Sequence, residues 1–115
     1  MRYLLGIYSD EKTWETFPPE QQGQEYAKYN DYSQWLRDQG LYVAGDALAA
    51  TDQATTVRVR EGKTATTDGP FAETKEQLGG YYVIEADNLD RAIEAAARCP
   101  GALYGSMEVR PIVDM

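Results

Sequence analysis

Short apolar runs alternate along this chain with longer stretches in which apolar residues recur every three or four positions. Residues 2–8, "RYLLGIY", form a run of strand-forming residues that predicts a first strand, buried on both faces. A polar stretch, residues 9–20, is expected to be a loop leading into a helix. Between residues 20 and 39 the spacing becomes helical, and Gly40 is a typical C-terminal stop. One side of this helix is predicted to carry Tyr26, Tyr29, Tyr32, Ser33 and Leu36, as core packing with phenolic oxygens at the rim.

The second half of the chain continues the pattern. Residues 41–49 predict a strand with a bulge or bend at Gly45. Residues 55–67 alternate in the manner of a hairpin around a two-residue Glu61-Gly62 turn. That turn pairs Val59 with Thr64 and Val57 with Thr66, and it points Arg58 and Arg60 to the other side. Residues 79–86 and 105–112 predict two further strands. Between them Asn88 caps a helix whose expected apolar face is Leu89, Ala92, Ile93 and Ala96.

This order of elements predicts the fold class. Two helices separated by consecutive strands, with a strand at each end, follow the βαββαβ plan of an α+β ferredoxin-like sandwich, here with an extra β-hairpin. Both helices would cover one face of an antiparallel sheet. The other face would be bare in a monomer and would be expected to find a partner.

Length, charge and cysteine content limit the number of domains, the kinds of partner and the location that this chain is expected to have. The chain of 115 residues suits one domain, residues 1–115. Nineteen acidic against eleven basic residues give a net charge of -8, which argues against nucleic acid or an anionic membrane as a partner. The single cysteine, Cys99, allows no intrachain disulfide and fits a reducing compartment. The first apolar run is short for a secretory signal, and no run reaches the roughly 20 residues of a membrane span, so a cytoplasmic location is expected.

A long charged connection, "TTDGPFAETKEQLGGYY" at residues 66–82, joins two strand-like runs. Asp68 is its central residue, because hairpin alternation places this carboxylate on the valine face, where it is costly unless hydrogen-bonded or at an opening. One interpretation is structural. Asp68 would form an Asx-type turn onto Phe71, stiffened by Gly69 and Pro70, and the Phe71 ring would fill the core.

The other interpretation of Asp68 is functional. Desolvation would make this carboxylate a general acid or base, and Lys75 would act as an electrostatic clamp for a ligand oxygen. Asp46 is a second carboxylate candidate, with a solvated turn residue as the alternative. Glu73, Lys75 and Glu76 are most simply a solvated charge cluster.

Two further candidates lie near the end of the chain. Arg110 is expected to pair with an acid across the sheet, with ligand contact as the alternative. Cys99 is interpreted as a packed thiol, because no histidine or cluster of basic residues lies close in sequence to activate it. No cofactor is predicted, since the chain has no phosphate loop, no Rossmann glycine pattern and no paired Cys/His metal site.

Several segments together resemble one known family. "MRYLLGIY", "GLYVAGDAL", "TVRVREGK", "DGPFAETKEQLGGYY" and "EVRPI" occur in the order typical of the YCII-related, DGPF-motif family of small bacterial proteins. The resemblance implies a ferredoxin-like protomer, a homodimer of the dimeric α+β barrel type formed through the sheets, and a ligand or active site beside the motif. Some relatives are linked to extracytoplasmic-function sigma factors, which implies a regulatory association. Others carry a His-Asp pair, which this chain lacks because it contains no histidine.

Three functions therefore remain open at the level of sequence, and the blandest of them is a structural dimer that binds no ligand. The second is a small-molecule-binding module, in which Asp46, Gly69, Pro70, Phe71, Lys75 and Arg110 are the candidate ligand contacts. The third is an enzyme that uses Asp68 as general acid or base on a small substrate. The missing histidine favours the binding module.

Overall fold

The computed structural model describes all of residues 1–115. Its strands are β1 (Arg2–Ser9), β2 (Tyr42–Ala47), β3 (Thr55–Arg60), β4 (Lys63–Asp68), β5 (Gln77–Glu85) and β6 (Ser106–Pro111). Its helices are α1 (Glu11–Glu15), α2 (Pro19–Asp38) and α3 (Leu89–Ala97), with short 3₁₀ turns η1 (Thr51–Gln53) and η2 (Pro100–Leu103). No helix combines the length and the apolar character that crossing a membrane requires.

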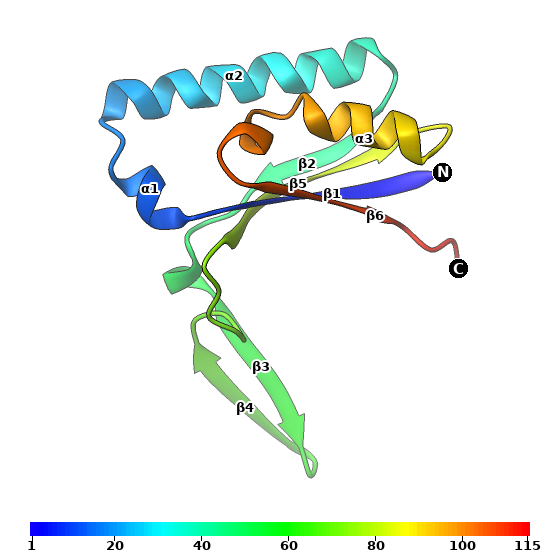
Figure 1. Cartoon of the computed structure of the whole chain (residues 1–115). Helices are drawn as coiled ribbons and strands as arrows, with labels where there is room; N and C mark the ends of the chain where they lie inside the picture. Colours follow the sequence, from blue (N-terminus) through cyan, green and yellow to red (C-terminus); the bar gives the residue numbers. More distant parts are fainter.

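Four strands form one antiparallel sheet in the order β2-β5-β1-β6. The two central strands are β1, whose sequence predicted burial on both faces, and β5. Helices α2 and α3 both lie over the same face of this sheet (Figure 1). This arrangement is a mixed α+β fold compatible with the predicted ferredoxin-like sandwich.

Strand alternation builds the core beneath the two helices. Tyr3, Leu5 and Ile7 of β1 are all buried, while Leu4 between them points to the other face. The core side chains are Tyr3, Leu5, Ile7, Tyr32, Leu36, Leu41, Tyr82, Ile84, Ala86, Ala92, Ala95, Ala96 and Cys99. Tyr32 donates its hydroxyl to the Ala95 carbonyl at 2.7 Å, which ties α2 to α3. The predicted packing role of Cys99 is confirmed, since its side chain is buried.

Three expectations about the helices were wrong. Helix α1 occupies part of the predicted loop, and the Asp10 side chain caps it by accepting a hydrogen bond from the Lys12 N–H. Tyr26 is 56% exposed rather than in the core. On α3 the alanines are buried as expected, whereas Leu89 and Ile93 are about half exposed. The helix packs on the core through its small alanine side chains.

Gly45 has a different role from the one predicted. The register shift in β2 falls between Tyr42 and Ala44, so the bulge lies at Val43. At Gly45 a Cβ atom would stand 2.5 Å from the Tyr82 ring. Glycine is therefore needed here so that the ring can pack closely against the strand.

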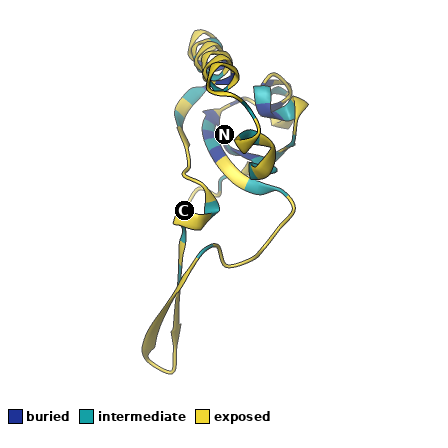
Figure 2. Cartoon of the chain, turned by 90° about the vertical axis from the view of Figure 1, so that its left-hand side faces the viewer, coloured by how far each residue is buried: buried dark blue, intermediate teal, exposed yellow.

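The β3–β4 hairpin projects away from the body of the molecule (Figure 1). Its predicted register is confirmed, with Val59 opposite Thr64 and Val57 opposite Thr66. Glu61 and Gly62 both have positive φ, as a type I′ turn requires. Almost every residue of the hairpin is exposed (Figure 2). The radius of gyration is accordingly 16.0 Å, against about 13 Å expected for a compact domain of this length.

The face of the sheet opposite α2 and α3 has no covering element. By strand alternation it carries an apolar centre made of Leu4, Tyr8, Leu78, Tyr81 and Val83. We call these five residues the open face. The expected helix-free face is thus present, and its central side chains are partly exposed.

Candidate functional site

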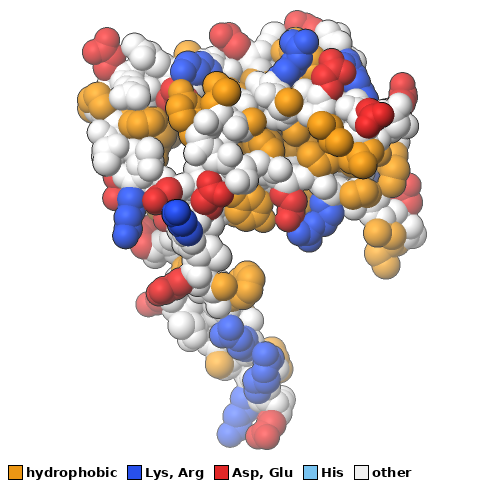
Figure 3. Space-filling view, in the orientation of Figure 1, with side chains coloured by type: hydrophobic (Ala, Val, Ile, Leu, Met, Phe, Trp, Pro, Cys, Tyr) orange, Lys and Arg blue, Asp and Glu red, His pale blue; other side chains and the backbone are white.

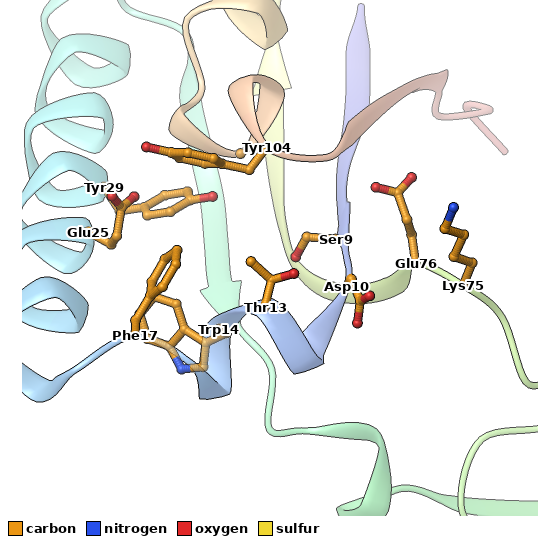
Figure 4. A pocket seen from close by; sticks show the side chains of 11 residues that line it. Ser9, Asp10, Thr13, Trp14, Phe17, Glu25, Tyr29, Lys75, Glu76 and Tyr104 are labelled. Atoms are coloured by element: carbon orange, nitrogen blue, oxygen red, sulfur yellow. The ribbon is translucent and has the colours of Figure 1, made fainter.

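A cavity of about 500 Å³ opens at one end of the molecule, beside the N-terminal half of α2. It is lined by Ser9, Asp10, Thr13, Trp14, Phe17, Glu25, Tyr29, Lys75, Glu76, Gly101 and Tyr104. These residues come from the end of β1, α1, α2, the connection before β5, and η2. We call this cavity the α1 pocket. Figure 4 shows that it has an aromatic end, next to α2, and a charged end, next to β5.

Trp14 and Phe17 form one wall of the aromatic end, with ring centroids 5.8 Å apart. Trp14 and Tyr26 also pack in a T-shaped arrangement, with ring centroids 5.3 Å apart. This contact explains why Tyr26 lies outside the core, since it supports the pocket wall instead. Tyr29 and Tyr104 face this wall from the other side (Figure 4).

Hydrogen bonds made by the side chain and the backbone of Glu11 hold α1 in place. Its carboxylate accepts from both the N–H and the hydroxyl of Thr51, each at 2.8 Å. The Glu11 N–H donates to the Gln77 side chain at 3.0 Å. Helix α1 is only five residues long and has no buried residue. Its position, and with it the aromatic wall, therefore depends on these tertiary contacts.

Glu25 is the one charged side chain among the buried residues, with 6% of its surface exposed. Lys28 donates a hydrogen bond to Glu25 Oε1 at 2.9 Å. That hydrogen bond raises the pKa of the Lys28 ammonium, which also lies 6.0 Å from the centre of the Tyr104 ring. A buried carboxylate requires such a partner. Glu25 Oε2 accepts no hydrogen bond from the chain.

Tyr29 is a partly buried residue of the aromatic end. Burial, followed by the nearby Cys99, raises the pKa of the Tyr29 phenol, so the ring remains neutral. Burial likewise raises the pKa of the Cys99 thiol, against the opposing effect of hydrogen bonds with Gly101 and Tyr29. A Cβ at Gly101 would stand 2.7 Å from the Tyr29 hydroxyl, so glycine is needed for this tyrosine to reach its position.

The charged end consists of Asp10, Glu76 and Lys75. One oxygen of Asp10 caps α1, and Glu76 Oε1 accepts a hydrogen bond from the Ser106 hydroxyl at 2.8 Å. The second oxygen of each carboxylate accepts no hydrogen bond from the chain. Lys75 forms no salt bridge and is exposed. The pocket thus contains three carboxylates, each held by one oxygen and free at the other.

The structure places the DGPF segment elsewhere, at the base of the hairpin. Asp68 is exposed, ends β4 opposite Thr55, and its carboxylate accepts no hydrogen bond from the chain. The predicted Asx-type turn is therefore wrong. Gly69 has φ +96° and donates its N–H to the Ala54 carbonyl at 2.7 Å. Pro70 is exposed.

Phe71 does not fill the core. Its ring is 81% exposed, so that expectation was wrong. The segment lies at the base of the hairpin, outside the layers formed by the sheet and the two long helices (Figure 1). Asp68 and Phe71 both lie outside the α1 pocket.

Two other predicted residues lie on the uncovered side of the sheet, at its two edges. Asp46 on β2 accepts a hydrogen bond from the Tyr81 hydroxyl at 2.9 Å, and that bond raises the pKa of Tyr81. Arg110 on β6 donates to Glu108 Oε1 at 2.7 Å. The expected ion pair across the sheet was wrong, because Arg110 pairs with a neighbour on its own strand.

Of the residues predicted as ligand contacts, only Lys75 lines the α1 pocket. The sequence interpretation missed Trp14, Phe17, Glu25 and Tyr104. A signal for part of this wall was present, because Asp10 is a helix-capping residue type followed by two aromatic residues three positions apart.

Comparison with known proteins agrees with the sequence resemblance. Residues 1–115 match the YCII-related domain family, and the chain belongs to it. An uncharacterized protein of Rhizobium meliloti (strain 1021) is 34% identical to this chain over 114 residues, which cover 97% of this chain and 92% of the relative.

Proposed function

We propose that this member of the YCII-related family is a homodimeric module that binds a small organic molecule in the α1 pocket and serves a regulatory role. The observation that carries the proposal is the pocket itself. Its volume of about 500 Å³ lies within the roughly 300–1,000 Å³ of small-molecule sites. Aromatic side chains form one end and a few polar groups the other, as in such sites generally.

Binding fits the geometry better than catalysis by Asp68. A carboxylate used as a general base near neutral pH needs desolvation or a charged neighbour. Asp68 is exposed in the single chain and has no salt-bridge partner. The regulatory role is proposed from the family resemblance.

The dimer is proposed from the open face. An uncovered sheet face with an apolar centre of Leu4, Tyr8, Leu78, Tyr81 and Val83 favours association. A second copy presents the same apolar centre, so two open faces are complementary in character. The hairpin projects on the uncovered side of the sheet (Figure 1), where it would reach alongside the second copy.

Charge supports a second copy as the partner of the hairpin. Arg58, Arg60 and Lys63 lie around its tip against the single acid Glu61, whereas the whole chain carries a net charge of -8. Figure 3 shows these basic side chains along the projecting hairpin. A basic arm on an acidic body is attracted to the body of another copy.

Fluorescence of Trp14 offers a direct test of binding. The chain has two tryptophans, and only Trp14 lines the pocket, so a Trp35→Phe variant leaves one reporter there. Screening small metabolites of positive, neutral and negative charge against this variant is expected to yield compounds that change Trp14 emission. Each hit is then incubated with the unaltered protein and assayed for turnover. A screen in which no compound of any charge perturbs Trp14 would refute the proposed function, and turnover abolished by Asp68→Asn would replace it with the enzyme.

Light scattering tests the dimer. We expect twice the chain mass at micromolar concentration and the monomer mass for Val83→Asp, which places a charge in the open face. Leu103→Asp, at an 81% exposed position on η2, is the matched control and is expected to stay dimeric. A monomeric mass for the unaltered protein would contradict the dimer.

A further inference from the structure

We infer that the ligand of the α1 pocket is an organic cation, with an ammonium group held among the four aromatic rings. This inference rests on the proposed function and names the chemical class that the same site would take. Three features of the pocket carry it: its charge, its aromatic lining, and the way in which its carboxylates are held.

The first feature is charge. Glu25 is offset by Lys28, which leaves Asp10 and Glu76 against the exposed Lys75. The pocket therefore keeps an excess of negative charge inside a molecule of net charge -8. A low-dielectric cleft that carries one sign of charge concentrates ligands of the opposite sign. An anionic ligand would find only one basic residue in the lining, Lys75.

The second feature is the aromatic lining. Trp14, Phe17, Tyr29 and Tyr104 converge on one end of the pocket (Figure 4). The face of an aromatic ring attracts a cation, most strongly when water is excluded, and several rings together recognise quaternary ammonium groups. The Lys28 ammonium already lies 6.0 Å from the centre of the Tyr104 ring, so this ring accepts a cation in the structure itself.

The third feature is the free oxygen on each carboxylate. Lys28, the N–H of Lys12 and the Ser106 hydroxyl each engage one oxygen of Glu25, Asp10 and Glu76, respectively. These contacts fix the three groups without saturating them, because an ionised carboxylate accepts several hydrogen bonds. An ammonium among the rings would thus have the oriented Glu25 carboxylate beside it, with Asp10 and Glu76 adding attraction from the other end of the pocket (Figure 4). Glu25 is the most buried of the three, and desolvation strengthens its attraction for a second cation.

Three compounds of similar shape and different charge test the assignment. Choline, its neutral carbon analogue 3,3-dimethylbutan-1-ol, and the anion 3,3-dimethylbutanoate are titrated against the Trp35→Phe protein while Trp14 emission is followed. We expect choline to bind at least about tenfold more tightly than the alcohol, a difference that cation–π attraction and one carboxylate can supply. Binding of the carboxylate should be the weakest.

Paired variants separate the contribution of an aromatic ring to choline binding from that of a carboxylate charge. Tyr104 is 56% exposed, so replacing it spares the core. Tyr104→Leu removes a ring and is expected to weaken choline selectively, whereas Tyr104→Phe keeps the ring and should restore the preference for choline over the alcohol. Asp10→Asn keeps a capping side chain and is expected to weaken choline about two- to fivefold. Glu73→Gln removes an acid outside the pocket and is the control for overall charge.

The outcomes distinguish this inference from the proposed function. Equal or tighter binding of the alcohol or the carboxylate would overturn the cation assignment and leave a binding pocket. So would a ligand of another class that perturbs Trp14 while choline does not. If no compound of any charge perturbs Trp14, the proposed function itself fails.

Discussion

The four-stranded sheet and the β3–β4 hairpin use the same antiparallel backbone ladder, yet only the sheet has a core. Leu5 and Ile84, on neighbouring strands of the sheet, are fully buried, whereas Val57 and Val59 of the hairpin are each close to 60% exposed. A two-stranded hairpin in water is marginally stable by itself. The sandwich of the same chain leaves the valine face of the hairpin uncovered, and the proposed dimer would supply the missing contact.

The largest expected effect breaks the sandwich and spares the hairpin. Leu5→Ala removes a fully buried side chain and is expected to lower the free energy of unfolding by about 2–5 kcal/mol. Val59→Ala at low protein concentration, where the hairpin remains solvated, should cost no more than about 0.5 kcal/mol. Urea unfolding of both variants measures the difference. Equal losses would mean that the hairpin packs against its own sandwich.

High pH also acts on the sandwich alone. Burial raises the pKa of Cys99 and of Tyr32, and the hairpin contains neither residue type. The folded state keeps these protons after the unfolded chain has begun to lose them, at about pH 8.5 for cysteine and about pH 10 for tyrosine. Their stabilisation is complete below those values and is lost as pH rises towards the folded pKa. The free energy of unfolding should fall by up to about 1.4 kcal/mol per pH unit for each group.

Urea unfolding at intervals from pH 7 to pH 10 measures this loss. Cys99→Ala isolates the thiol contribution, because the free energy of unfolding of this variant should fall less steeply with pH between pH 8 and pH 10. A free energy of unfolding that stays constant over this range in the unaltered protein would contradict the burial of these groups.

A smaller effect is expected for the proposed contact between the hairpin and a second copy. Val57→Asp places a charge on the valine face and should raise the dimer dissociation constant about tenfold, equivalent to about 1.4 kcal/mol. Thr67→Asp is the control. Thr66 lies opposite Val57, so the same charge at its neighbour Thr67 lies on the other face of the hairpin. Analytical ultracentrifugation compares the two. Equal weakening would indicate a general charge effect, and no weakening would remove the hairpin from the interface.

The smallest effect concerns the DGPF segment. Phe71 is 81% exposed and Asp68 is unpaired, so Phe71→Ala and Asp68→Asn should each change the free energy of unfolding by no more than about 0.5 kcal/mol. Urea unfolding at low protein concentration measures this change in a single chain. A loss of several kcal/mol for Phe71→Ala would restore the interpretation of this ring as a core anchor.

The sequence by itself determined the local features of the fold, which depend on residues close together in the chain. Two-residue alternation and a turn that accepts positive φ fixed the register of the hairpin, and Asn88 marked the start of α3, where its side chain accepts a hydrogen bond from the Arg91 N–H. The order of strands and helices was enough to predict an antiparallel sheet with both long helices on one face. These features follow from local backbone preferences and from the periodicity of apolar residues.

Only the tertiary structure decided which residues meet at a site. The α1 pocket joins Trp14, Tyr29, Glu76 and Tyr104, which are up to 90 positions apart in the chain, and no periodicity reports such a meeting. The same limit explains Phe71 and Ile93, whose apolar side chains predict burial. Both are exposed in the structure, because Phe71 lies at the base of the projecting hairpin and α3 packs on the sheet through its alanines. Burial depends on the space around a residue, and that space exists only after distant segments have packed together.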